Sequence, residues 1–330
     1  MSAGVALIGT GMWGRRLAAA AGRAGLRVVT CFARDEGARA AFAAESGCEA
    51  ASSLEAAVTH PGVDGVLVVT PNDVHLEHAA LAARHRRHVF VEKPIADTVE
   101  AGERLRDACA EAGVVLMVGH AFRRLGAARK VRELVDAGAL GRVVLAEATF
   151  SLPGRLPPSA WRAHRARNAG GPLMQLGIHH VDTLAYWLRP IAASSGRFAH
   201  VATDADIDDV GVVTLRFASG ALGVVTGSYV SPHTHWLRLQ GTDAVLEYRT
   251  DFRIWPDAQR MDAATELLLG GEPVAFDERD MLAEELAEFA ACMATGAAPE
   301  TGAEEGLMAL RAVTDAVADA QGAAAVGAGA

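Results

Sequence analysis

The first 120 residues repeat one pattern, in which an apolar run of strand length is followed by a segment with helical period. The expected strands are 5–8, 28–32, 66–69, 89–91 and 114–118, and the expected helices are 13–24, 36–46, 53–58, 74–83 and 99–112. Continuous apolar runs are typical of strands buried on both faces, as in a parallel sheet covered by helices. The alternation predicts a doubly wound α/β domain over residues 1–120.

After residue 120 the pattern changes. A helix is expected over 127–137, a strand over 142–150 and a helical stretch over 173–188. Strands then follow one another from 196 to 255, with a hairpin pattern over 210–229, and two helices, 280–295 and 303–321, close the chain. Consecutive strands predict a largely antiparallel sheet. Residues 121–330 are therefore expected to form an α+β domain.

The composition limits the functions that the chain can have. Its formal net charge of −9 argues against a nucleic-acid partner, which requires a basic face. No run of eighteen apolar residues occurs, so no segment is expected to cross a membrane. The four cysteines are scattered and the N-terminus lacks the pattern of a secretory signal. These features predict a cytoplasmic protein with reduced thiols.

A glycine-rich segment, Gly9-Thr10-Gly11-Met12-Trp13-Gly14, joins the first expected strand to the first expected helix. Gly9 permits a tight turn, Gly11 lets backbone N–H groups approach a pyrophosphate, and Gly14 lets the helix pack on the strand. The helix N-terminus then faces the anion with its unsatisfied N–H groups. This context predicts a Rossmann domain whose six loop residues bind a nicotinamide dinucleotide.

The end of the second strand bears on the choice of cofactor. NAD enzymes usually place an acid there to bind the ribose 2′-hydroxyl. In this sequence the position holds Ala33 followed by Arg34, which suits the 2′-phosphate of NADP. Asp35 comes next, and a strand that ended later would favour NAD. We expect NADP, with NAD as the alternative.

Three further segments together point to a family. Thr70-Pro71-Asn72 with His75 follows the strand over 66–69, Glu92-Lys93-Pro94 follows the next strand, and residues 170–182 open the main helix of the second domain. In order and spacing they resemble the Gfo/Idh/MocA oxidoreductase family, which includes glucose–fructose oxidoreductase and inositol dehydrogenase. The resemblance covers essentially the whole chain. It also includes Trp161-Arg162 and the C-terminal segments 284–289 and 301–306.

The resemblance implies a catalytic role for Lys93 beside the nicotinamide and the substrate hydroxyl. Oxidation of an alcohol by hydride loss requires a base to take the hydroxyl proton, and ketone reduction requires the same group as an acid. A lysine near a cationic ring has its pKa lowered toward neutrality. The resemblance also implies that further residues line the cofactor site: Thr70, Pro71, Asn72, His75, Glu92 and Arg162.

The second segment of the family is commonly Asp-x-x-x-His, whose i, i+4 spacing puts both side chains on one helix face. His179 matches the histidine and is expected to be catalytic, and Asp182 matches a common acid one turn later. Gln175 replaces the usual aspartate. A glutamine can hydrogen-bond a substrate hydroxyl but cannot transfer a proton, so proton transfer falls on Lys93 and His179.

Other positions are expected to contact the substrate or to depart from the family. Ala121 stands where the family often has asparagine. Arg123 matches the usual arginine, which either faces the substrate or braces the domain junction. Trp161 is expected to line the cleft. His179-His180 and His233-Thr-His235 provide no third ligand by spacing, so no metal is expected.

The sequence thus predicts an NAD(P)-dependent oxidoreductase that acts on a secondary alcohol or ketone of a sugar, cyclitol or related polyol. Two alternatives stay open. One is an NAD-dependent glycosidase of the same fold, and the other is a non-catalytic NAD(P)-binding protein, to which the loss of the aspartate points. In the family an open-faced sheet forms the subunit interface, which implies a homodimer or homotetramer.

Overall fold

The computed structural model describes residues 2–154, 156–157 and 159–327, with side chains up to residue 322. The chain forms two compact units. Unit 1 contains residues 1–121 and 282–307, and unit 2 contains residues 122–281 and 308–330. In the described part of the chain, no helix is long and apolar enough to span a bilayer.

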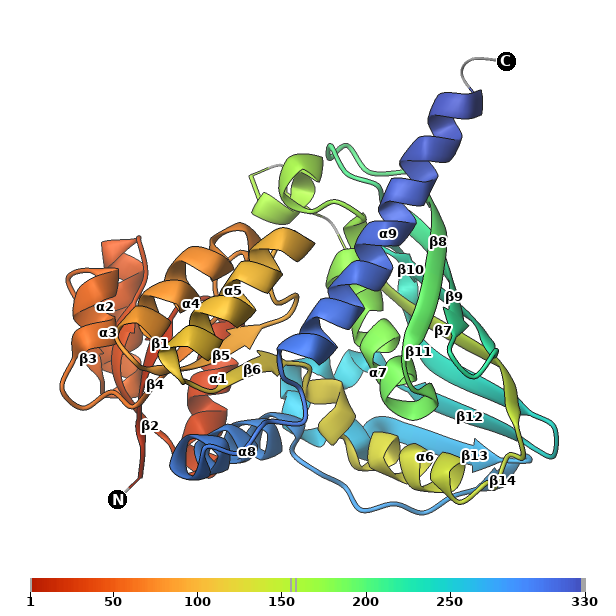
Figure 1. The fold of residues 1–330 in the computed structure, drawn as a ribbon, viewed down its shortest axis with the longest axis horizontal. Helices are drawn as coiled ribbons and strands as arrows, with labels where there is room; N and C mark the ends of the chain where they lie inside the picture. The colour runs from red at the N-terminus through yellow and green to blue at the C-terminus, as the bar shows by residue number, and fades with distance from the viewer. Residues whose placement is uncertain (1, 155, 158, 328–330) are drawn as a thin grey trace. The chain divides into compact units, whose positions relative to one another are not determined.

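Unit 1 is built on a six-stranded parallel sheet of order β3-β2-β1-β4-β5-β6 (Figure 1). The strands are β1 (Gly4–Ile8), β2 (Arg27–Phe32), β3 (Glu49–Ala50), β4 (Gly65–Val68), β5 (His88–Glu92) and β6 (Leu116–Gly119). The helices between them are α1 (Met12–Arg23), α2 (Glu36–Ser46), α3 (Leu54–Thr59), α4 (His75–Arg84) and α5 (Val99–Ala112). The predicted doubly wound domain is confirmed. The strand order reverses between β1 and β4, the place where such sheets bind ligands.

The segment 282–307 belongs to unit 1, although the sequence placed it in a second domain over 121–330. It contains most of α8 (Met281–Thr295) and the start of α9 (Ala303–Gly327). The Phe289 ring lies 5.8 Å from the Phe90 ring, and the Val118 N–H donates to the Thr301 carbonyl at 2.7 Å. The apolar side of α8 is therefore buried against unit 1, a pairing that the chain order does not reveal.

Unit 2 is built on an eight-stranded sheet of order β14-β13-β12-β11-β7-β10-β9-β8. The strands are β7 (Val143–Pro153), β8 (Ile191–Ala199), β9 (Val210–Phe217), β10 (Leu222–Ser228), β11 (Val230–Gly241), β12 (Val245–Thr250), β13 (Thr265–Leu269) and β14 (Glu272–Pro273). Every neighbouring pair is antiparallel except β7 and β10. The predicted largely antiparallel sheet and its hairpin β9–β10 are confirmed.

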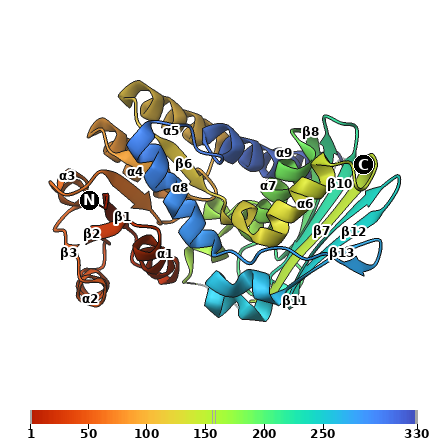
Figure 2. The ribbon, with the colours of Figure 1, turned by 90° about the horizontal axis from the view of Figure 1, so that it is seen from below.

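The helices α6 (Gly126–Asp136) and α7 (Ile178–Leu188) lie on one face of this sheet, as Figure 2 shows. Strand residues alternate accordingly, so that Val213, Leu215 and Phe217 are buried while Val212 and Arg216 are exposed. Two segments differ from the expected pattern. Residues Leu173–Gly177 form a π-helical turn before α7, and Phe252–Ala264 form 3₁₀ turns. A Cβ on Gly177 would lie 2.6 Å from the Leu173 side chain, so a larger residue there would require Leu173 to shift.

Candidate functional site

The glycine loop at the end of β1 has the geometry of a phosphate-binding turn. Gly9 has φ 106°, and a Cβ there would lie 2.4 Å from the Val69 carbonyl oxygen. A Cβ on Gly14 would lie 2.1 Å from the Gly9 carbonyl oxygen, so glycine alone fits both positions. A Cβ on Gly11, in contrast, would meet no neighbouring atom within 4 Å. The backbone at Gly11 is therefore open to an approaching ligand.

The start of α1 differs from the starts of α2, α3 and α5. Asp35, Ser53 and Thr98 each cap a helix by accepting a backbone N–H, at the starts of α2, α3 and α5. The α1 helix begins after Gly11 with no side-chain cap and no acid in its first turn. No side-chain cap takes up its first N–H groups, which suits an anion from outside the chain. These residues fit the pyrophosphate of a dinucleotide.

At the end of β2 the side chain of Asp35 is already engaged. Its Oδ1 accepts the Ala38 N–H at 2.7 Å as the cap of α2. Arg39 donates to the Ala33 carbonyl at 2.9 Å and lies over the Phe32 ring, so it braces the turn. Arg34 is exposed. Burial is the main cause that lowers the pKa of His78, and the charge of Arg34 lowers it further.

His75 is fully buried between two loops of the expected cofactor site. Its Nε2 lies 2.8 Å from the Thr70 carbonyl oxygen and its Nδ1 lies 3.0 Å from the Pro94 carbonyl oxygen. Burial lowers the pKa of this imidazole. The ring connects the Thr70-Pro71-Asn72 loop to the turn at Lys93, whose peptide bond to Pro94 is cis. His75 thus contributes to the site through the two loops that it joins.

The turn after β5 presents Lys93 between buried neighbours. Lys93 is partly exposed, whereas Glu92 and Pro94 are buried. The Glu92 carboxylate accepts the Trp13 indole N–H at 2.5 Å and the Lys93 backbone N–H at 3.2 Å. Burial raises the pKa of Glu92 to about 7, although the Trp13 hydrogen bond and the charge of Lys93 lower it. Glu92 therefore lies between the start of α1 and the lysine.

In unit 2, the residues matched to the family's second segment lie on or beside α7. His179 stacks on Phe122, with ring centroids 4.2 Å apart and planes 15° from parallel. Arg123 forms a two-fold hydrogen-bonded ion pair with Asp182, at 2.7 and 2.6 Å, and both side chains are buried. The arginine fork is thus directed to α7 within unit 2, and both roles that the sequence left open for Arg123 stay predictions.

Gln175 lies in the π-helical turn within a polar network. Its Nε2 donates to Asn168 Oδ1 at 3.0 Å, and its Oε1 accepts from Arg162 Nε at 3.4 Å. Asn168 in turn donates to the Arg162 carbonyl at 3.0 Å. The Arg162 guanidinium lies 4.7 Å from the Trp161 ring, and burial lowers its pKa. Asn168 and Phe122 were not predicted, because no periodicity or motif distinguishes them.

The remaining histidines of unit 2 that lie near this helix are directed into the sheet. His180 Nε2 lies 3.1 Å from the Thr149 carbonyl oxygen, and burial lowers the pKa of this ring to about 4. Burial also lowers the pKa of His235, whose ring centroid is 4.7 Å from that of His180. Both rings are therefore neutral at physiological pH. Within the described residues, no three His, Cys, Asp or Glu side chains gather as metal ligands.

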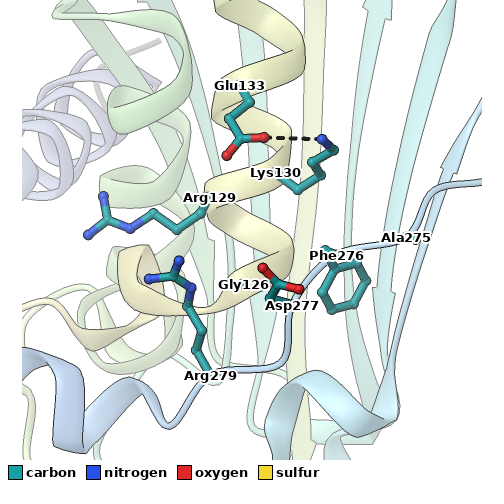
Figure 3. A pocket seen from close by; sticks show the side chains of 8 residues that line it. All are labelled: Gly126, Arg129, Lys130, Glu133, Ala275, Phe276, Asp277 and Arg279. Atoms are coloured by element: carbon teal, nitrogen blue, oxygen red, sulfur yellow. Dashed lines mark hydrogen bonds and ion pairs between the residues drawn. The ribbon is translucent and has the colours of Figure 1, made fainter.

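A separate polar pocket lies at the start of α6 (Figure 3). None of the predicted site residues lines it. Lys130 and Glu133 form an ion pair at its edge, with the charged atoms 3.1 Å apart. The lining residues are Gly126, Arg129, Lys130, Glu133, Ala275, Phe276, Asp277 and Arg279.

Comparison with known proteins identifies the family. A model described as an oxidoreductase family with an NAD-binding Rossmann fold matches residues 3–120, and a GFO/IDH/MocA C-terminal domain model matches residues 128–247. D-xylose 1-dehydrogenase (NADP(+)) 2 of Haloferax volcanii is 32% identical over 85% of this chain and 85% of its own length. The chain belongs to the Gfo/Idh/MocA oxidoreductase family. The predicted family and enzyme class are thereby confirmed.

Other relatives extend the comparison. 1,5-anhydro-D-fructose reductase of Ensifer adhaerens is 34% identical over 56% of each chain. A structure described as an NADPH-dependent oxidoreductase from Desulfitobacterium hafniense matches with a TM-score of 0.94 and 32% identity, over 98% of this chain and 96% of that one. Levoglucosan dehydrogenase in complex with NADH and levoglucosan matches with a TM-score of 0.84 at 20% identity, over 98% of both chains, which shows a shared fold.

Proposed function

We propose that this enzyme transfers a hydride between NADP and a secondary alcohol or ketone of a sugar or related polyol, with Lys93 as the acid–base group. The observation that carries the proposal is the turn after β5, in which a partly exposed lysine stands between buried residues beside an ionisable glutamate. Relatives named as D-xylose dehydrogenase and anhydrofructose reductase support a sugar as the substrate.

The choice of lysine at this position supports proton transfer. Lys93 and Lys130 are the two lysines of the sequence, in which arginine otherwise supplies the positive charge. Arginine cannot be deprotonated in proteins, whereas lysine changes its pKa readily when it is partly buried. A position that required only a positive charge would be served by arginine. A lysine at residue 93 is therefore consistent with a group that gives and takes a proton.

The chemistry divides between the cofactor and the chain. A bound nicotinamide supplies the hydride acceptor or donor. In the oxidative direction the hydroxyl proton passes to the neutral Lys93 amine as the carbon loses its hydride, and in reduction the Lys93 ammonium returns that proton. His179, whose ring is held by Phe122, is proposed to orient the reacting hydroxyl. Gln175 and Trp161 are proposed to bind other parts of the sugar.

A panel of sugars and cyclitols, assayed with NADP and with NAD, tests the proposal. We expect NAD(P)H formation or consumption with at least one sugar and not with unrelated alcohols. Hydrolysis of a nitrophenyl glycoside without net NADH formation would instead identify an NAD-dependent glycosidase. Micromolar cofactor binding without turnover of any candidate would identify a non-catalytic binding protein.

We expect the cofactor preference to depend on Arg34. Asp35 caps α2 and Arg39 braces the turn, so Arg34 is the group that is proposed to pair with the 2′-phosphate of NADP. Replacing Arg34 by alanine should raise KM for NADP by about 10- to 100-fold, the effect of losing a charged hydrogen bond, and should leave KM for NAD nearly unchanged. The exposed Arg104→Ala variant on α5 serves as a control. Equal effects on both cofactors would contradict this role.

The uncovered face of the eight-stranded sheet is proposed to bind a second copy of the chain. Alternation directs Leu145, Val224 and Trp236 to this face, and Glu147 there accepts hydrogen bonds from Arg238 and Gln240 at 2.6 and 2.7 Å. An apolar face with polar groups already paired among themselves is typical of a homodimer interface.

Light scattering after size exclusion tests this interface. We expect a mass of two or four times the 34.4 kDa of one chain. The double variant Leu145→Arg/Val224→Arg should give the mass of one chain, because buried unpaired charges oppose association. The variant Ala40→Arg, at an exposed position on α2, should keep the wild-type mass. A wild-type protein that is monomeric at micromolar concentration would contradict the proposal.

A further inference from the structure

A hydrogen bond in unit 1 joins two motifs that are 79 residues apart in the sequence. The indole N–H of Trp13, on the first turn of α1, donates to Glu92 Oε1 at 2.5 Å. Trp13 belongs to the glycine loop, and Glu92 is the last residue of β5. The Arg16 guanidinium lies over the Trp13 ring, 5.4 Å from its centroid, as in a cation–π contact.

The surroundings of Glu92 contact both oxygens of its carboxylate. A Cβ on Gly119, in the neighbouring strand β6, would lie 3.0 Å from Oε1, so the carboxylate rests against a position that has no side chain. Its second oxygen, Oε2, accepts the Lys93 backbone N–H at 3.2 Å. Both oxygens are therefore engaged, one by α1 and the other by the turn that carries the lysine.

We propose that Trp13 is a positioning residue for the reaction, because its indole fixes the Glu92 carboxylate and Glu92 fixes the backbone of Lys93. The inference rests on the proposed role of Lys93. Through this chain of contacts, the helix that faces the cofactor pyrophosphate also sets the place of the acid–base group. The glycine loop predicted cofactor binding for Trp13 and the family resemblance predicted it for Glu92, and their contact with each other adds a role toward the lysine.

The loss of the indole donor has a predictable consequence for Lys93. A buried carboxylate that loses a hydrogen-bond donor becomes harder to keep ionised. Glu92 would then be protonated at neutral pH, and the Lys93 ammonium would lose the negative charge beside it. The Lys93 amine would in turn be deprotonated more readily and held less firmly. The variant Trp13→Phe removes the donor and retains an aromatic ring.

We expect Trp13→Phe to lower kcat about 10- to 100-fold, which corresponds to one hydrogen bond to a charged group, while the Kd of NADPH changes by less than about three-fold. Trp187→Phe is the matched control, because Trp187 donates a buried hydrogen bond to the Ala128 carbonyl in unit 2 at 2.9 Å. The control should lower the unfolding temperature and leave kcat unchanged. An unchanged kcat in Trp13→Phe, or an equally large rise in the Kd of NADPH, would overturn the proposal.

A second measurement does not require turnover. Because the sequence has two lysines, acetic anhydride labelling followed by peptide mass spectrometry compares Lys93 directly with Lys130. We expect the Lys93 to Lys130 labelling ratio to rise in Trp13→Phe and in Glu92→Gln, and to rise no further in the double variant. An unchanged ratio would overturn the Trp13 assignment even if the enzyme oxidised sugars. If the variants gave the expected labelling ratios but the wild-type protein turned over no sugar, the proposed function would be refuted and the Trp13 assignment would stand.

Discussion

Replacing Lys93 by methionine is expected to lower kcat by about 10²- to 10⁴-fold, the range that a positioned acid–base group contributes, with little change in the Kd of the cofactor. Methionine keeps most of the length and apolar surface of the lysine side chain but carries no proton. Turnover measured by NAD(P)H absorbance, with the best sugar of the panel, gives kcat. Fluorescence titration with NADPH gives the Kd.

Two variants test whether the loss of kcat in Lys93→Met results from the loss of proton transfer. Lys130→Met removes the other lysine of the chain, whose ion pair with Glu133 on α6 is half-exposed, and should keep wild-type kcat. Lys93→Arg keeps the positive charge but cannot act as a base at neutral pH, so it should be nearly as inactive as Lys93→Met. Undiminished turnover in Lys93→Met would remove this residue from the mechanism.

The largest effect on stability is expected at the ion pair between Arg123 and Asp182. The side chains are 5% and 1% exposed and are joined by two hydrogen bonds. The variant Asp182→Ala leaves the guanidinium buried without its carboxylate partner, which typically costs about 3–5 kcal/mol of unfolding free energy. Calorimetry should show the unfolding temperature lowered by roughly 6–20 °C, as expected for a domain of this size.

Two comparison variants distinguish the loss of stability caused by a buried unpaired charge from that caused by the loss of an exposed ion pair. Asp136→Ala breaks an ion pair with Arg132 at the surface of α6, where Asp136 is half-exposed, and the unfolding temperature should stay close to that of the wild type. The double variant Arg123→Met/Asp182→Leu replaces both charges with apolar groups and should recover most of the lost stability. An Asp182→Ala protein as stable as the wild type would contradict a buried pair.

Much of the fold could be predicted because its determinants are local. The expected helices over 36–46 and 99–112 have the observed bounds of α2 and α5, and each has a capping residue, Asp35 or Thr98, directly before it. The role of Gly14 is also local, since the Gly9 carbonyl oxygen lies where a Cβ would be, whereas the oxygen that crowds Gly9 belongs to the distant Val69. Periodicity, caps and glycine turns act over a few residues and are readable along the chain.

The candidate site was only partly predictable for the opposite reason. The sequence indicated Lys93, His179 and Gln175 as residues that carry chemistry, but it could not show what holds them. Phe122 stacks on His179, and Asn168 binds Gln175, yet neither belongs to a recognisable pattern. Packing partners depend on which surfaces come into contact after the chain has folded. The sequence alone does not show those contacts.

By itself, the sequence determined a parallel dinucleotide-binding sheet and a second, largely antiparallel sheet, and it predicted a glycine loop for phosphate and a lysine that transfers a proton. The tertiary structure alone decided that Glu92 binds Trp13, that Arg123 is paired with Asp182, and that residues 282–307 return to unit 1. These contacts join residues from 59 to well over a hundred positions apart. Hydrogen bonds and apolar contacts depend on distance in space, and only the folded chain fixes that distance.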